Sequence, residues 1–286
     1  AHNPSAHKGR GIPGMSSPLV GRDAEARALE GALDQLRSGI GGIVTLVGEA
    51  GIGKSRLVAE IRDAAGSSLR WVEGRSLSYD GTTVYALWNR VIRALLAVAE
   101  DAAAADVGRR LQATMDDLET AGVNSPGGAS HAFLAQVLGA PLNGPDRAMV
   151  TQMDGPARQD ATFAAVVRLV RLTAEQQPLV IVCEDLHWSD PTSLQLLEHV
   201  LPLTDHVPLL LICVFRPLRE HACWRMREIA VRRYPHRHID LQLSPLSPET
   251  GERLLRNLLT SIPGPAGETV VEQLPQALRE TTLSLG

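Results

Sequence analysis

The segment GEAGIGKS, residues 48–55, decides the fold of this chain. It follows the apolar run IVTLV, residues 43–47, and precedes RLVAEI, residues 56–61, which has a helical pattern. The spacing G-x-x-x-x-G-K-S between a strand and a helix is that of a phosphate-binding loop. We expect Gly48, Gly51 and Gly53 to adopt positive φ, so that backbone N–H groups and the helix N-terminus surround a phosphate chain.

Two side chains at the end of this segment complete the interpretation. Lys54 supplies a positive charge for the β- and γ-phosphates, and Ser55 supplies a hydroxyl ligand for Mg²⁺. The alternative is a chance glycine-rich turn, and the flanking strand and helix argue against it. The chain is therefore expected to bind a nucleoside triphosphate or its diphosphate.

Apolar runs and amphipathic patterns alternate along the rest of the chain. Uninterrupted apolar strands alternating with helices indicate an α/β fold, in which helices cover both faces of a parallel sheet. Two Pro- and Gly-rich stretches, 122–129 and 139–156, read as loops around an inserted helical segment. The expected strands are 43–47, 69–72, 179–183, 209–215 and 239–243, and the expected helices begin at Asp23 and cover 54–65, 84–99, 161–176 and 191–201.

Composition narrows the class of protein. The chain has 286 residues, 44% of them hydrophobic, and a net charge of −4, which gives no overall footprint for nucleic acid. No apolar stretch approaches the roughly 20 residues that span a bilayer, and the N-terminal residues lack a signal-peptide core. The three cysteines have no metal-ligand spacing and are expected to be reduced core thiols. These features predict a cytoplasmic protein without membrane segments.

An acidic pair ends the apolar run PLVIVC. Glu184 and Asp185 come directly after it, at the carboxyl end of a predicted buried strand, where ligands of parallel sheets bind. One carboxylate is expected to hold Mg²⁺, with Ser55, and the other to orient or deprotonate the attacking water. Glu184 stands where a metal-associated acid is common and Asp185 where a catalytic acid is common, although both remain candidate metal ligands. The shorter Asp185 predicts slow hydrolysis.

Three further groups of residues are candidates for a functional role. Arg216 follows the apolar run LLLICVF and is expected to reach a γ-phosphate, the alternative being an ion pair with Glu220. His187 and Trp188 follow the acidic pair, and contact with the nucleotide and simple packing are equally favoured for them. The basic stretch 225–238 is expected to be a solvated or interdomain face, so nucleic acid is not an expected partner of this segment.

The motifs together resemble the signal-transduction ATPases with numerous domains (STAND), relatives of AAA+ proteins. The resemblance rests on GEAGIGKS, on EDLHWSDPTSL at 184–194, on the strand end FRP at 215–217 and on SPLVGRDAE at 17–25. Three stretches are especially similar to the ATPase modules attached to bacterial class III adenylate/guanylate cyclases: GIPGMSSPLVGRDAE, DGPARQDATF, and the segment after Arg216. Similar modules occur in LuxR-type transcriptional activators.

The resemblance implies an ATP/ADP and Mg²⁺ site and a role for each matching residue. It implies a P-loop NTPase sandwich of the ASCE type, whose five-stranded parallel sheet has an extra strand between the P-loop (Walker A) strand and the acidic (Walker B) strand. Glu184 and Asp185 would bind the metal and orient the attacking water. Lys54 would act with them in catalysis, and Arg216 would be the sensor of the γ-phosphate. Val20, Gly21 and Arg22 would lie by the adenine, and the phosphates would be held by Gly48, Glu49, Ala50, Gly51, Ile52, Gly53, Lys54, Ser55 and Arg56.

It also implies a division of the chain and a set of partners. Residues 1–18 would be a flexible linker, 19–243 the nucleotide-binding domain and 244–286 a helical lid. The lid is expected to be incomplete, because the chain stops at the glycine where a Gly-Asn-Pro stretch is expected. The implied partners are an adenine nucleotide, a cyclase upstream, helical repeats downstream and a nucleotide-dependent oligomer.

The predicted function is an ATP-binding, slowly hydrolysing regulatory switch module of a multidomain bacterial signalling protein. The alternatives are the ATPase module of a LuxR-type regulator and a P-loop small-molecule phosphotransferase. The chain lacks the NKxD motif that a GTPase needs to read its base and the LSGGQ-like signature of ABC-type ATPases.

Overall fold

The computed structural model describes residues 19–120 and 128–260. The chain divides into two compact units, 28–243 and 1–27 with 244–286. The predicted division into a linker, a domain 19–243 and a lid stays a prediction. The N-terminal tail and the lid residues beyond 260 lie outside the described residues.

The larger unit is built on a five-stranded parallel sheet with the order β2-β3-β4-β1-β5. Strand β4 lies between β1, which leads into GEAGIGKS, and β3, which leads into the acidic pair, so the predicted extra strand and the fold class are confirmed. All seven residues of β4 are buried, as expected for a central parallel strand. The strands are β1 (Gly42–Val47), β2 (Arg70–Arg75), β3 (Leu179–Glu184), β4 (Leu209–Phe215) and β5 (His238–Gln242).

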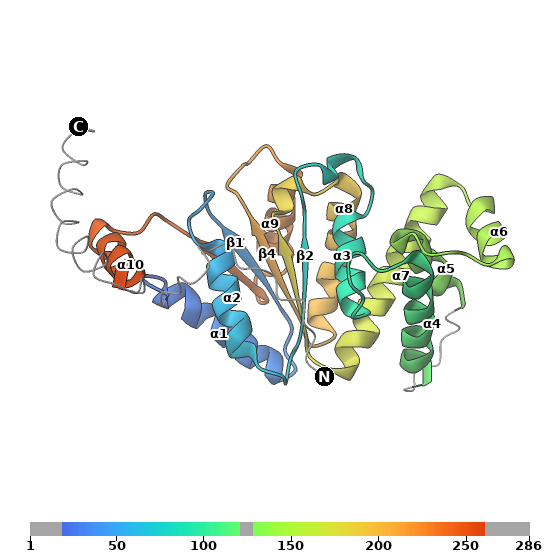
Figure 1. Cartoon of the computed structure of the whole chain (residues 1–286), viewed down its shortest axis with the longest axis horizontal. Coiled ribbons are helices and arrows are strands. Elements are labelled where there is room, and N and C mark those ends of the chain that lie inside the picture. The colour runs from blue at the N-terminus through green and yellow to red at the C-terminus, as the bar shows by residue number, and fades with distance from the viewer. Residues whose placement is uncertain (1–18, 121–127, 261–286) are drawn as a thin grey trace. The chain divides into compact units, whose positions relative to one another are not determined.

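Helices pack on both sides of this sheet, with α2 on one side and α3 and α8 on the other (Figure 1). Two helices of the sandwich start at aspartate caps. Asp154 and Asp190 accept hydrogen bonds from the backbone N–H groups of Ala157 and Ser193, at 2.8 and 2.9 Å. The helices of the sandwich are α1 (Asp23–Arg37), α2 (Lys54–Ala65), α3 (Ala86–Leu95), α7 (Gly155–Gln176), α8 (Pro191–Val200) and α9 (Ala222–Arg233), with 3₁₀ turns η1 (Asp80–Thr82), η2 (Leu186–Trp188) and η3 (Leu201–Asp205).

The inserted helical segment consists of α4 (Ala104–Thr120), α5 (Gly128–Leu138) and α6 (Gly144–Gln152), which gather beside α7 (Figure 1). The expected loop over 139–156 is wrong, because it contains α6 and the first residues of α7. In both helices glycine and proline occupy the first turn, where proline costs no hydrogen bond, and Asn143 caps α6 by accepting from the Asp146 N–H at 2.8 Å. The other expected loop falls mostly on residues 121–127, outside the described part.

The core is aliphatic with few aromatic side chains. Trp88 and Phe215 are among its largest fully buried members, and the Trp88 indole N–H donates to the Ser193 carbonyl at 3.0 Å. Cys183, Cys213 and Cys223 are free and buried, as the sequence predicts, and burial raises the pKa of Cys183 to about 12. None of the described helices is both long and apolar enough to cross a membrane.

The smaller unit contains Val20–Arg22 and helix α10 (Pro248–Thr260). Arg22 is buried, donates to the Ser244 carbonyl at 2.7 Å and pairs with Glu25 at 3.3 Å. Gly21 has φ +68°, and a Cβ there would collide with Thr250. The chain therefore needs glycine at position 21 for both its backbone angle and its space.

Candidate functional site

The phosphate-binding segment forms the turn between β1 and α2. Gly51 and Gly53 have φ of +75° and +104°, and a Cβ on either would meet no atom within 4 Å, so this side of the loop is open. The expectation of positive φ is wrong for Gly48, which is absent from the left-handed residues. Its constraint is space, because a Cβ there would lie 2.9 Å from Ile52 Cγ2 and 3.2 Å from Leu243 Cβ.

Lys54, the first residue of α2, turns its side chain back into this loop. Its Nζ donates to the carbonyl oxygens of Gly48 and Glu49 at 2.7 and 2.8 Å. Burial lowers the pKa of Lys54, and the nearby charge of Asp185 opposes that shift while Arg216 adds to it. The ammonium group therefore lies within electrostatic reach of the other predicted site residues.

Ser55 and Glu184 are brought together from α2 and β3. Their side chains share a hydrogen bond, which lowers the pKa of Glu184 against the larger effect of burial, which raises it. A hydroxyl and a carboxylate side by side form a hard oxygen donor set that suits Mg²⁺. Among the described residues no cluster of three His, Cys, Asp or Glu can hold a metal.

Asp185 makes an ion pair that the sequence analysis did not anticipate. Arg75, the last residue of β2, donates from Nε and Nη2 to Asp185 Oδ2 at 2.9 and 2.7 Å. Asp185 itself is left-handed, with φ +55°, an uncommon conformation for a residue other than glycine. Arg75 was missed because the expected strand ended at residue 72, whereas β2 continues to Arg75 and places it opposite Glu184 in the register.

Arg216 directly follows β4 at the same edge of the sheet. Burial has the largest effect in lowering the pKa of Lys54 and of His187, and the charge of Arg216 adds to both shifts. Within residues 19–120 and 128–260 it forms no ion pair, and the alternative pairing with Glu220 is not formed. The structure thus leaves Arg216 available beside the phosphate loop.

His187 lies in η2, directly after the acidic pair, and is 5% exposed. Neither ring nitrogen has a hydrogen-bond partner among the described residues, and burial lowers the pKa of His187 to about 4. Its ring packs 5.0 Å from that of Trp188, which is 37% exposed. The two open interpretations, nucleotide contact and packing, thus apply to a neutral, buried imidazole.

Not all of the other predicted site residues lie at the phosphate-binding loop. Glu49 and Ala50 are exposed at the loop and Ile52 is half-buried. Arg56 is exposed on α2 and pairs with Glu60 at 3.0 Å. Val20, Gly21 and Arg22 belong to the smaller unit, so their adenine contact stays a prediction.

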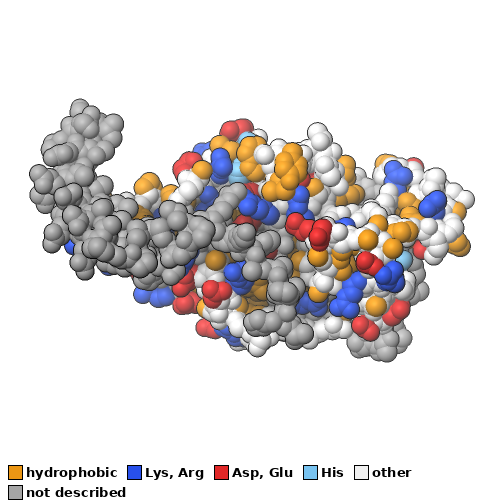
Figure 2. Space-filling view, in the orientation of Figure 1, with side chains coloured by type: hydrophobic (Ala, Val, Ile, Leu, Met, Phe, Trp, Pro, Cys, Tyr) orange, Lys and Arg blue, Asp and Glu red, His pale blue; other side chains and the backbone are white. Residues whose placement is uncertain are grey.

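The basic stretch after Arg216 is largely neutralised by acids. Arg227 pairs with Asp240 at 2.5 Å, Arg237 with Asp205 at 2.9 Å, and Arg225 with Glu198 at 3.5 Å. On the face seen in Figure 2, basic and acidic side chains are interspersed rather than gathered into one basic surface. The interpretation of this stretch as a solvated or interdomain face stays a prediction.

Comparisons with known proteins give one family and a set of distant structures. The model of the AAA ATPase domain matches residues 18–212, more than half of the chain. A curated uncharacterized protein of Rhizobium meliloti (strain 1021) is 28% identical over 206 residues, which are 71% of this chain and 19% of that protein. The chain therefore spans about a fifth of that relative.

Two of the similar solved structures are archaeal. The ORC1 protein of Aeropyrum pernix in complex with DNA is 16% identical with a TM-score of 0.45, over 86% of this chain and 50% of that one. The STAND protein with a tetratricopeptide repeat sensor from Pyrococcus horikoshii is 15% identical with a TM-score of 0.36, over 90% and 28%. The phosphate loop, the strand order and the family match lead to one conclusion: this chain belongs to the AAA ATPase domain family.

Proposed function

We propose that this chain is the ATP-binding, slowly hydrolysing switch module of a multidomain bacterial signalling protein of the STAND class. Members of the AAA ATPase domain family generally bind ATP or ADP with Mg²⁺, and membership makes this chain an ATPase domain. The finer assignment to the STAND class, and to a module attached to a cyclase, rests on the sequence resemblance. A LuxR-type regulator is the alternative context for the same module.

The observation that supports a slow switch best is that the carboxylates of Glu184 and Asp185 have different partners. Glu184 shares a hydrogen bond with Ser55, as a pair of Mg²⁺ ligands would. Asp185 is held by Arg75 through two hydrogen bonds to one oxygen. The guanidinium occupies Oδ2 with both hydrogen bonds, so only Oδ1 is left to accept a proton from water.

Each residue then has a defined task toward the nucleotide. The backbone N–H groups at the start of α2 and the Lys54 ammonium bind the phosphates, with Lys54 exchanging its carbonyl partners for phosphate oxygens. Mg²⁺, when bound, neutralises phosphate charge beside Ser55 and Glu184. Arg216 binds the γ-phosphate, and Asp185 orients the attacking water with the oxygen that Arg75 leaves free.

A switch requires that ATP and ADP favour different conformations of the same protein. Arg216 directly follows β4, and Asp185 begins the connection from β3 to α8. In the proposed switch, both residues respond to the presence of a γ-phosphate. A weak base keeps the ATP-bound state long-lived. Neighbouring domains, a cyclase upstream and helical repeats downstream, and a nucleotide-dependent oligomer are the partners that this proposal includes.

The decisive experiment follows ATP, ADP and GTP binding by calorimetry with Mg²⁺, and phosphate release in the same samples. We expect saturable ATP and ADP binding, and release of inorganic phosphate at well below about 1 s⁻¹, under the range typical of enzymes. A folded protein that binds no nucleotide would refute the proposal. Transfer of the γ-phosphate to an added small-molecule alcohol or amine, instead of water, would favour the phosphotransferase.

A further inference from the structure

A second cavity of about 410 Å³ lies in the larger unit, between the sandwich and the inserted helical segment. It is lined by residues from the start of α3, from α5, from the first turns of α7 and from α8. None of its lining residues belongs to the candidate nucleotide site. Its volume falls within the range of small-molecule pockets, roughly 300–1,000 Å³.

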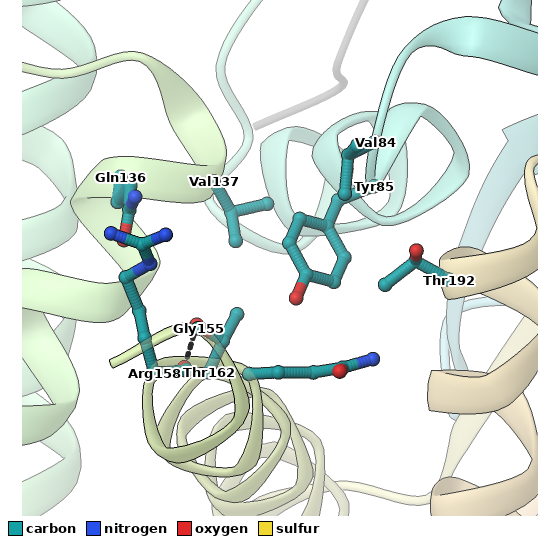
Figure 3. Close-up of a pocket in the computed structure, with 9 residues that line it drawn as sticks. Val84, Tyr85, Gln136, Val137, Gly155, Arg158, Thr162 and Thr192 are labelled. Carbon is teal, nitrogen blue, oxygen red and sulfur yellow. Dashed lines mark hydrogen bonds between the residues drawn. The ribbon is translucent and has the colours of Figure 1, made fainter. Parts of the chain in front are cut away.

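The walls combine one cation with neutral polar and apolar groups (Figure 3). Arg158, in the first turns of α7, is half-buried and lies next to Gln136 of α5. Within residues 19–120 and 128–260 the Arg158 guanidinium has no ion-pair partner. Tyr85 and Val137 supply apolar surface, and Thr192 faces Tyr85 from α8. Among the described residues that line the cavity, none is acidic.

Asp190 is a buried acid beside Tyr85 that does not line the cavity. Its Oδ1 accepts hydrogen bonds from the backbone N–H groups of Ser193, at 2.9 Å, and Tyr85, at 3.3 Å, whereas its buried Oδ2 has no hydrogen-bond partner among the described residues. Asp190 caps the N-terminus of α8, whose partial positive charge partly offsets the carboxylate. Arg158 carries the only charge among the described lining residues, which favours an anion in the cavity.

Tyr85 forms a rigid wall in an uncommon conformation. Its φ is +63°, which a bulky residue adopts only when its surroundings impose it. Its ring meets Phe163 edge-on at 6.2 Å, which fixes its orientation. Residues held in such conformations cluster at ligand sites, where the cost maintains a preformed shape.

We infer that this cavity binds a small organic anion, a carboxylate or a phosphate ester with a short carbon body. Arg158 and Gln136 bind the anionic group, since a guanidinium offers paired donors that match its oxygens. Val137 and the Tyr85 ring contact the carbon body, and Thr192 and Gln159 fix its orientation. This ligand is separate from the nucleotide.

Residues that line the cavity also contact the segment between β3 and α8, which begins at Asp185. Asp190, which accepts from the Tyr85 N–H, lies in that connection between β3 and α8. Ser189 beside it is hydrogen-bonded to Ser76, which follows Arg75 at the end of β2. A ligand against Tyr85 and Thr192 therefore stabilises one arrangement of the segments that hold Asp185 and Arg75, and so changes nucleotide affinity reciprocally.

The test uses succinate and glycerol 3-phosphate as probes, and succinamide and glycerol as neutral controls, in calorimetry without nucleotide. We expect at least one anion to bind saturably while its neutral control does not. Arg158→Gln is expected to weaken that binding about tenfold or more. Arg171→Gln, an exposed arginine further along α7 that pairs with Glu175, is the matched control and keeps it. The identity of the anion that binds separates carboxylate from phosphate recognition.

Several outcomes would overturn the inference. They are the failure of both anions to bind, binding that survives Arg158→Gln, and binding that is lost in Lys54→Ala instead, which would place the probe in the phosphate loop. Gln136→Leu, at an exposed position, gives a second test if Arg158→Gln does not fold. A saturating probe should change the dissociation constant of ATP at least about threefold, and an unchanged constant would refute the coupling. ATP binding by Arg158→Gln alone is expected to be normal.

Discussion

Arg75 and Asp185 form an ion pair across the carboxyl ends of neighbouring strands, with both hydrogen bonds on Asp185 Oδ2, at 2.9 and 2.7 Å. The pairing leaves Oδ1 for other partners and fixes the carboxylate beside Glu184. Arg75 is itself held in place, because Arg90 donates to its carbonyl oxygen at 2.7 Å. The pair therefore belongs to an ordered edge of the sheet.

Removing the charge of Arg75 should release Asp185. In Arg75→Gln, we expect ATP turnover to rise about threefold to tenfold, because both oxygens of Asp185 then become available to water. ATP affinity should stay within about twofold, since Arg75 has no phosphate to bind in the proposed role. Single-turnover phosphate release measures both quantities. Arg62→Gln, which breaks an ion pair to Glu73 of the same strand, is the control and should leave turnover unchanged.

If turnover falls in Arg75→Gln with binding intact, Arg75 orients Asp185 for catalysis instead of restraining it. That result would contradict the proposed slow base, and it is distinguishable from unfolding by an unchanged melting temperature.

The two carboxylates should have separable roles. Asp185→Ala is expected to keep ATP binding and to lose about 100-fold or more in hydrolysis, the usual contribution of a general base. Glu184→Gln is expected to weaken the dependence of ATP affinity on Mg²⁺, because it removes the charge next to Ser55. Titrating Mg²⁺ at fixed ATP in both variants separates the two effects. Equal hydrolysis in Asp185→Ala and the parent would contradict the assignment.

Much of this site follows from local patterns in the sequence. GEAGIGKS and the acidic pair after PLVIVC each combine a motif with the strand that positions it, and a parallel sheet brings the carboxyl ends of its strands to one edge. The order of the strands came from the family resemblance, because pairing between distant strands has no local signature.

Arg75 and α6 show where local patterns are insufficient. The alternating residues of WVEGR did not mark the end of β2, since the half-buried Glu73 and Arg75 are polar and the Arg75–Asp185 contact joins residues 110 positions apart. The pair Gly144-Pro145 was read as a loop signal, although the same dipeptide after a capping Asn143 starts a helix. In each case the same residues are compatible with two local structures, and a tertiary or capping interaction determines which one forms.

Lys54 should be essential for binding. Lys54→Ala removes the ammonium that lies inside the loop, and we expect ATP and ADP affinity to fall at least about 100-fold, as for loss of charge-assisted bonds to phosphate. Calorimetry with each nucleotide measures the loss. Arg37→Ala, an exposed arginine paired with Asp34, serves as the control. Undiminished binding by Lys54→Ala would place the nucleotide elsewhere.

Arg216 should distinguish ATP from ADP. If its unpaired guanidinium binds the γ-phosphate, Arg216→Ala should weaken ATP binding about tenfold and leave ADP binding unchanged. The ratio of the two dissociation constants is the readout, because a general loss of structure would move both. Arg219→Ala, an exposed neighbour 5.6 Å from the Trp224 ring, should keep the ratio of the parent. An equal loss for both nucleotides would refute the sensing role.

His187 should make the stability of the fold depend on pH. Burial lowers its pKa from 6.5 to about 4 in the folded protein, with Arg216, Lys54 and His221 adding to the shift and Asp185 opposing it. The unfolded chain therefore binds the extra proton first as the pH falls. The stabilisation is complete above pH 6.5 and is lost as the pH falls toward 4, by up to about 3 kcal/mol.

His187→Phe keeps an aromatic ring beside Trp188 and removes the titration. Urea unfolding at pH 7.5, 6 and 5 should therefore show a smaller loss of stability in this variant than in the parent. His206→Gln, at an exposed position, should lose stability as the parent does, and identical pH dependence in His187→Phe and the parent would show that the pKa of His187 does not change on folding.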